Sequence, residues 1–434
     1  MNRRKEIVMN RRIISILLSL VMVLTLVGVS IGCAKPTAES NPILVGCPGS
    51  WAAQPWALGG RYGQELAVDE INAAGGVNVG GVMRPFELVE IDTRDEEAGV
   101  PVSESLLGIE KLILQDKVDV ICGGPSMSEA SMAVIDLVSK YHILDIVSYG
   151  TWTPSWGKKV GEDIEKYGCS FRMSHNVAIL IPTAVDILNE MAEEYGFEKK
   201  AYIVIQDTMF CRNAMDVFAG LAEKSGWEVL GQELCPQGTT DYSPALMKVK
   251  NSGAPVMLIW TNDPTATIMM RQFIDLEVPA VPIGFCAAAQ EHEVYEAVGG
   301  KCEYIIFPSA DAAVTSTKFP EYVEFQKDYE EKFNKEPFGE AGSGYTTMYV
   351  LKQAIERAGS LDTDALITAM EQTDYMGLNG RVRFNKDNHE QIYSDDPNEG
   401  EMPAYSQWIG GKRVCIWPAA VADSKIVLPP WMKQ

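Results

Sequence analysis

Two short turns carry hydroxyl groups at positions where they could hold an acidic ligand. Ser126 and Ser128 lie between a predicted strand and the predicted helix that follows it. Gly150 and Thr151 follow the next predicted strand. A helix N-terminus presents N–H groups that, with a nearby hydroxyl, suit a carboxylate. A lone serine there is more often a helix cap, but two such turns on adjacent strands favour anion binding.

Aromatic residues gather at the predicted carboxyl ends of strands. Five of the nine tryptophans lie there, which is more than we expect by chance. Single aromatic residues at such places pack into a core or a hinge, whereas a group of them indicates a cleft that stacks on a planar or bulky apolar ligand. The residues concerned are Trp51, Trp56, Tyr149, Trp152, Trp156, Phe210 and Trp260.

Cysteine nucleophiles are a weaker hypothesis. Cys211 and Cys286 lie near predicted strand ends, but no histidine accompanies either of them in a recognisable arrangement. Buried or disulfide-bonded cysteine is therefore the favoured interpretation. Cys47 and Cys122 end strands that we expect to be neighbours, where a disulfide and simple packing both remain open.

The motifs of common enzyme classes are missing from the sequence. It contains no P-loop, no Gly-x-Gly-x-x-Gly and no His-Glu-x-x-His. One Gly-x-Ser-x-Gly, over residues 28–32, lies in an apolar N-terminal segment that cannot form a nucleophile elbow. Nine cysteines without a Cys-x-x-Cys, and only four histidines, leave no zinc-finger spacing. The sequence therefore predicts no catalytic residues, no metal and no other cofactor.

Length and charge limit the class of protein further. The 434 residues suffice for two or three domains with sizeable cores. There are 37 basic and 59 acidic residues, a formal net charge of −22. Affinity for nucleic acid comes mainly from Lys and Arg on phosphates. The composition therefore argues against a nucleic-acid partner.

The N-terminus resembles the signal of a bacterial lipoprotein. Five basic residues precede an apolar run over 13–32, which ends in Ser30-Ile31-Gly32 before Cys33. Leu is usual where Ser30 stands, and a plain transmembrane anchor is the alternative. Lipidation of Cys33 would leave 34–41 as a short tether and place the protein outside the cytoplasm, on the membrane. Met1 and Met9 are alternative start sites with the same mature product.

The rest of the chain alternates strand and helix, which indicates parallel sheets covered by helices on both faces. The pattern restarts after Arg172, so we expect two similar α/β units in series, with ligand binding at the carboxyl ends of the strands. The predicted strands cover 42–47, 86–92, 118–122, 143–147, 201–206, 228–234, 256–260, 281–285 and 303–307. The predicted helices cover 61–73, 102–114, 128–141, 209–225, 243–251, 265–276, 320–333, 345–358 and 363–372.

Three segments together carry a family resemblance. They are residues 62–77, which read YGQELAVDEINAAGGV, then Phe171-Arg172 and Met270-Arg271-Gln272. In order and spacing the chain resembles the type I solute-binding proteins of ABC importers, in the branched-chain amino acid branch. The signal ending at Cys33 agrees, because lipid-anchored members occur widely in this class.

The resemblance implies an α/β fold of two doubly wound parallel-sheet lobes that close on a small molecule. It implies three hinge crossovers, near 172–176, 307–309 and 382–385. Lobe 1 is then 42–173 plus 309–382, and lobe 2 is 174–308 plus 383–434. It further implies a monomer that delivers its ligand to an ABC permease.

The resemblance also implies which positions line the cleft. The family's carboxylate-binding serine falls on Ser128 and its threonine on Thr151, while Tyr149 supplies a backbone carbonyl. The aromatic residue that caps the ligand falls on Trp56. In the second lobe, an aromatic position falls on Phe210 and the family's tyrosine on Asn262.

One implied position departs from the family pattern. The acidic residue that pairs with the ligand's ammonium in leucine-type binders falls on Cys286, and a thiol cannot replace a carboxylate opposite a buried cation. We therefore expect an aromatic or hydrophobic acid without an α-amino group, with an ordinary amino acid as the alternative. The residues that could compensate are Asp207, Asp263, Glu291 and His292.

Three functions remain open from the sequence. The favoured hypothesis is a lipid-anchored binding protein for a small carboxylate-bearing ligand. The alternatives are a ligand sensor on the same fold and, less favoured, a hydrolase that uses Cys211 or Cys286.

Overall fold

The computed structural model describes residues 41–52, 55–97, 99–309 and 316–432. The predicted lipid anchor Cys33, its signal segment and all but the last residue of the tether lie outside the described residues. Within the ranges given, no helix has the length and apolar character needed to cross a membrane.

The first sheet has five parallel strands in the order β4-β1-β5-β6-β7. Apolar residues of β1 point to both faces, so helices must cover both. One face packs against α2, α13 and α14, and the other against α3 and α4. The strands are β1 (Ile43–Gly49), β4 (Phe86–Asp92), β5 (Val120–Gly123), β6 (Asp145–Val147) and β7 (Ser170–Arg172). The helices are α2 (Pro55–Ala73), α3 (Val102–Lys111), α4 (Ser128–Tyr141), α13 (Ala341–Ala358) and α14 (Thr363–Met370).

The second sheet has seven strands in the order β16-β15-β12-β11-β10-β8-β9. The strands from β12 to β9 are parallel, and β15 and β16 close one edge antiparallel. Alternate residues of β10 point to opposite faces: Leu258 packs under α7 and α8, and Ile259 under α9 and α10. The strands are β8 (Lys200–Gln206), β9 (Glu228–Cys235), β10 (Val256–Thr261), β11 (Val281–Cys286), β12 (Ile306–Pro308), β15 (Tyr405–Ile409) and β16 (Lys412–Trp417). The helices are α7 (Val177–Tyr195), α8 (Met209–Lys224), α9 (Ser243–Ser252) and α10 (Ala266–Asp275).

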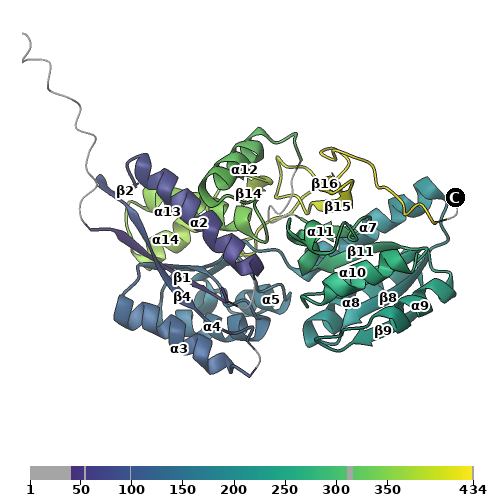
Figure 1. Cartoon of the computed structure of the whole chain (residues 1–434). Helices are drawn as coiled ribbons and strands as arrows, with labels where there is room; N and C mark the ends of the chain where they lie inside the picture. Colours follow the sequence, from purple (N-terminus) through teal and green to yellow (C-terminus); the bar gives the residue numbers. More distant parts are fainter. Residues whose placement is uncertain (1–40, 53–54, 98, 310–315, 433–434) are drawn as a thin grey trace, which may run out of the picture.

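The chain passes between the two sheets three times, and Figure 1 shows the two sheets in separate halves of an elongated molecule. It leaves the first sheet after β7, returns after β12 to form α12–α14, and leaves again after β14 to form β15 and β16. The remaining elements are β2 (Val77–Val79), β3 (Val82–Arg84), α5 (Ser155–Glu162), α6 (Ile164–Tyr167), α11 (Val294–Ala297), α12 (Pro320–Phe333), β13 (Tyr375–Gly377) and β14 (Gly380–Val382), with short non-α turns over Leu112–Asp116 and Ala287–Gln290.

The expected fold class, two doubly wound lobes with parallel sheets, is confirmed. Most predicted elements lie within three residues of their observed bounds. The helix predicted over 61–73 begins six residues earlier, at Pro55. The helices α5 and α7 were not predicted from the sequence. The first half of α7 is an apolar run with Pro182 inside it, and proline within such a run is usually evidence against a helix.

Close contact between α2 and α13 joins segments far apart in the sequence, which lie side by side in Figure 1. A Cβ atom added at Gly63 would lie 1.9 Å from the carbonyl oxygen of Ala341, and one at Gly344 would lie 2.0 Å from that of Gly60. Glycine at both positions is therefore what lets the two helix backbones touch.

We predict that Gly63→Ala lowers the free energy of unfolding by at least roughly 2 kcal/mol, because the added methyl group must separate two backbones. The matched control is Gly220→Ala on the exposed side of α8, where a Cβ meets nothing within 4 Å. That change should raise stability by about 0.5–1 kcal/mol. Denaturant titration of both variants measures this, and equal effects would contradict the packing argument.

Candidate ligand-binding cleft

A cavity of about 740 Å³ lies where loops of both sheets meet. This volume is within the range of small-molecule sites. Ser126 and Gly150 reach it from beyond β5 and β6 of the first sheet, and Thr208 and Asn262 from beyond β8 and β10 of the second. The cavity therefore lies at the carboxyl ends of the parallel strands, where such sheets bind ligands.

Seven of the nine predicted ligand-binding residues line this cavity; they are Trp56, Ser126, Ser128, Gly150, Thr151, Phe210 and Asn262. Tyr149 and Cys286 do not. Tyr149 is fully buried, and its hydroxyl donates to the carbonyl oxygen of Pro48 at 2.9 Å. Cys286 is also fully buried, on the side of β11 that packs against α9 and α10.

The first predicted anion turn already holds a carboxylate of the chain. Asp95 is buried, and its carboxylate accepts from the backbone N–H of Met127 at 2.5 Å and the hydroxyl of Thr93 at 2.5 Å. Burial raises the pKa of Asp95, and the hydrogen bonds from Met127 and Thr93 oppose that rise. Asp95 thus takes a donor at the start of α4 that we expected to serve a ligand.

The second predicted turn holds another carboxylate. Glu340, which directly precedes α13, accepts from the backbone N–H of Gly150 at 2.7 Å and from the indole N–H of Trp152 at 2.9 Å. Its side chain is buried and lines the cavity. The hydroxyl of Thr151 bonds to Ser131 and to the carbonyl of Pro125, so it serves the turn itself. The hypothesis of a ligand carboxylate on Gly150 and Thr151 is therefore disfavoured.

Aromatic side chains from both sheets meet at the cavity. Trp56 and Trp152 belong to the first-sheet side, and Phe210 and Phe285 to the second-sheet side. The rings of Trp152 and Phe285 lie with centroids 4.6 Å apart, and those of Phe210 and Phe285 lie 6.0 Å apart. Three of the seven aromatic residues singled out from the sequence therefore line the cavity, namely Trp56, Trp152 and Phe210. The other four, Trp51, Tyr149, Trp156 and Trp260, do not, and Trp156 and Trp260 are fully buried in the core.

The comparisons with known proteins agree with this geometry. The family model of the periplasmic binding proteins matches residues 45–394. The chain belongs to this family. A relative named Leu/Ile/Val-binding protein homolog 7, from Brucella melitensis, is 23% identical over 85% of this chain and 88% of its own length.

Two solved structures share the fold. A putative branched-chain amino acid ABC transporter protein from Silicibacter pomeroyi has a TM-score of 0.77 and 20% identity, over 90% of this chain and all of the other. An R. palustris ABC transporter solute-binding protein in complex with benzoate has a TM-score of 0.68 and 17% identity, over 90% of this chain and 99% of the other.

None of the acidic or basic residues expected to compensate for Cys286 lines the cavity of this periplasmic binding protein. Asp263 accepts from the backbone N–H groups of Gly238 and Thr265, and Asp207 pairs with Arg212. His292 lies 3.3 Å from Glu336. Asp95 and Glu340 line the cavity but were not predicted from the sequence. No local pattern marks Glu340, since it lies 190 residues from its partner Gly150.

The thiols do not resemble nucleophiles. All eight cysteines of the described chain are buried and free, including Cys47 and Cys122, whose strands do pair. Burial raises the pKa of Cys211 to about 11 and that of Cys286 to about 12. A catalytic thiol needs a lowered pKa, so these two positions disfavour the hydrolase hypothesis. In the part of the chain described, no group of three or more His, Cys, Asp or Glu could hold a metal ion.

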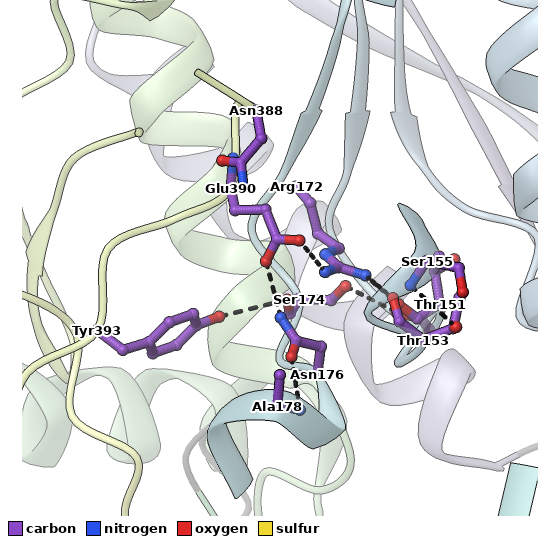
Figure 2. Close-up of polar contacts among 11 residues, drawn as sticks. Thr151, Thr153, Ser155, Arg172, Ser174, Asn176, Ala178, Asn388, Glu390 and Tyr393 are labelled. Carbon is purple, nitrogen blue, oxygen red and sulfur yellow. Dashed lines mark hydrogen bonds and ion pairs between the residues drawn. The ribbon is translucent and has the colours of Figure 1, made fainter. Parts of the chain in front are cut away.

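Arg172 joins the turn that holds Thr151 and Thr153 to the crossing segments, as Figure 2 shows. Its guanidinium is buried at the end of β7 and donates to the carbonyl oxygens of Thr151 and Thr153 at 2.7 and 2.8 Å. It also pairs with Glu390 at 2.6 Å, and Glu390 accepts from Asn176 at 2.8 Å. One ion pair thus joins a cavity turn to the first and third crossings.

We predict that Glu390→Gln lowers the free energy of unfolding by roughly 3 kcal/mol, because it leaves the buried charge of Arg172 without its counter-ion. Glu331→Gln is the matched control, since Glu331 pairs with Lys327 on an exposed face of α12 and exposed pairs contribute little. Thermal and denaturant unfolding measure both. A Glu390→Gln variant as stable as the control would contradict the role given to this ion pair.

Proposed function

We propose that this chain is the lipid-anchored binding component of an ABC importer, capturing a small molecule between its two sheets and delivering it to the permease. The observation that carries the proposal is the cavity whose walls come from the strand ends of both sheets. A ligand that touches both walls stabilises the conformation in which the walls approach. That closed conformation is the one the permease is expected to recognise.

The boundaries of the two moving bodies are part of this proposal. We assign 42–173 plus 309–382 to one lobe and 174–308 plus 383–434 to the other, with hinges at the three crossings. The sheets support the division, because β1, β4, β5, β6 and β7 form one and β8 to β12, β15 and β16 form the other. We further propose that the protein acts as a monomer outside the cytoplasm, held to the membrane by lipid on Cys33 and by the tether over 34–41.

The identity of the ligand cannot be inferred from the relatives. One relative is named for leucine, isoleucine and valine, and one structural neighbour holds benzoate. Leucine, isoleucine and valine each carry an amino group that benzoate lacks, and all four compounds carry a carboxylate. The carboxylates of Asp95 and Glu340 in the two turns of this chain argue against carrying that shared feature over.

We predict that Cys33→Ala abolishes incorporation of an alkyne-tagged fatty acid into the protein and releases it from the membrane fraction. The acyl chain is the anchor in this account, and its loss removes the membrane affinity. Cys235→Ala, at a buried cysteine of β9, is the control and should keep both the label and the membrane fraction. Membrane retention of the unlabelled Cys33→Ala variant would favour a transmembrane anchor instead.

The partner is tested by crosslinking the membrane-bound protein in its own cells and identifying the captured proteins by mass spectrometry. Capture of a permease and its ATPase supports delivery. Capture of a receptor kinase or chemoreceptor without a permease would overturn delivery in favour of the sensor.

A further inference from the structure

The charged residues that line the cavity are all acidic. Among the described lining residues there is no Lys, Arg or His. The acidic ones are Asp95, Glu96, Glu97, Glu129 and Glu340. Asp95 and Glu340 are buried. A second negative charge brought beside a buried carboxylate is disfavoured, because one of the two must take up a proton.

Two arginines beside the cavity turns already have acidic partners within the protein. Arg172 reaches the backbone of the Thr151 turn from the protein side and pairs with Glu390. Arg94 pairs with Glu97 at 2.7 Å on the surface. Neither side chain lines the cavity, so neither supplies a positive charge to an acidic ligand there.

The uncharged part of the cavity suits a cation with an apolar body. Trp56, Trp152, Phe210 and Phe285 supply aromatic surfaces, and a positively charged nitrogen is attracted to such faces. Ser126, 6% exposed, also lines the cavity, and its hydroxyl oxygen has no hydrogen-bond partner within the described residues. A hydroxyl oxygen can accept from an ammonium group.

We propose that the ligand is an amine or other organic cation with an apolar or aromatic body and without a carboxylate, its positive nitrogen seated against Glu340 between the aromatic side chains. This inference rests on the proposed function and names the ligand class of that same cavity. Glu340 is the specificity residue: its carboxylate takes the Gly150 N–H in place of a ligand carboxylate and presents negative charge to the cavity. The net charge of −22 adds long-range attraction for cations.

The test uses matched pairs of ligands that differ only in the charged end. The full-length chain in detergent is titrated by calorimetry with benzylamine against phenylacetate, 2-phenylethylamine against 3-phenylpropanoate, and isopentylamine against 4-methylpentanoate, with isoleucine added. We expect at least one amine to bind about tenfold more tightly than its matched acid, a difference typical of one favourable buried charge contact.

The variants separate the charge from the fold. Glu340→Gln keeps the shape of the side chain and should remove the preference for the amine, with the melting temperature measured alongside. Glu324→Gln, on the exposed face of α12 and away from the cavity, is the matched control and should keep the preference. A second cavity variant, Phe285→Leu, should weaken binding of the aromatic amine without strengthening binding of its matched acid.

The proposal is overturned if no amine in the panel binds more tightly than its matched acid, or if Glu340→Gln keeps the amine preference. Tighter binding of an acid or of isoleucine would contradict the proposed cationic ligand but would still support the solute-binding role. The binding role itself is judged by capture of the permease, so the two proposals fail independently.

Discussion

The buried carboxylate of Glu340 is the interaction on which the first-sheet wall of the cleft depends. A buried charge is costly unless hydrogen bonds compensate it. Here the N–H of Gly150 and the indole of Trp152 both donate to it. Those two bonds fix the turn after β6 and aim the Trp152 ring at Phe285 on the opposite wall. The Glu340 carboxylate, the turn after β6 and the contact of Trp152 with Phe285 therefore depend on one another.

Residues of the crossing segments also form hydrogen bonds to this turn. Arg172 donates to the carbonyls of Thr151 and Thr153, and Ser174 donates to that of Gly150 at 2.7 Å. Arg172 and Ser174 belong to the first crossing, and Glu390, which neutralises Arg172, belongs to the third. The turn on the cavity wall and two of the crossings therefore share one hydrogen-bonded network, which is the coupling that the proposed hinge closure needs.

The sequence predicted what local patterns control. The alternation of apolar strands, such as β1, with helices, such as α2, identified the strands, most helices and the two-lobed class. Turn residues at strand ends that were singled out from the sequence, Ser126 and Gly150 among them, line the cavity. These features depend on neighbours in the chain, so one sequence suffices to read them.

The chemistry of the cavity depended on contacts that no local pattern carries. Glu340 and Gly150 lie 190 residues apart in the sequence. Only the folded structure shows that the Glu340 carboxylate already accepts the N–H group that was predicted to bind a ligand. Cys286 was a predicted cleft residue but does not line the cavity: side chains alternate along a strand, so Phe285 faces the cavity and Cys286 faces α9 and α10. Trp156 and Trp260 lie close in sequence to residues that line the cavity, but their side chains are fully buried in the core.

The most direct test of the account is a high-resolution crystal structure of the protein purified from its own cells with the molecule it carries. The account predicts a positively charged nitrogen about 3 Å from the carboxylate of Glu340, with that carboxylate still on the Gly150 N–H. A ligand carboxylate bound to the Gly150 N–H, with Glu340 displaced, would contradict it.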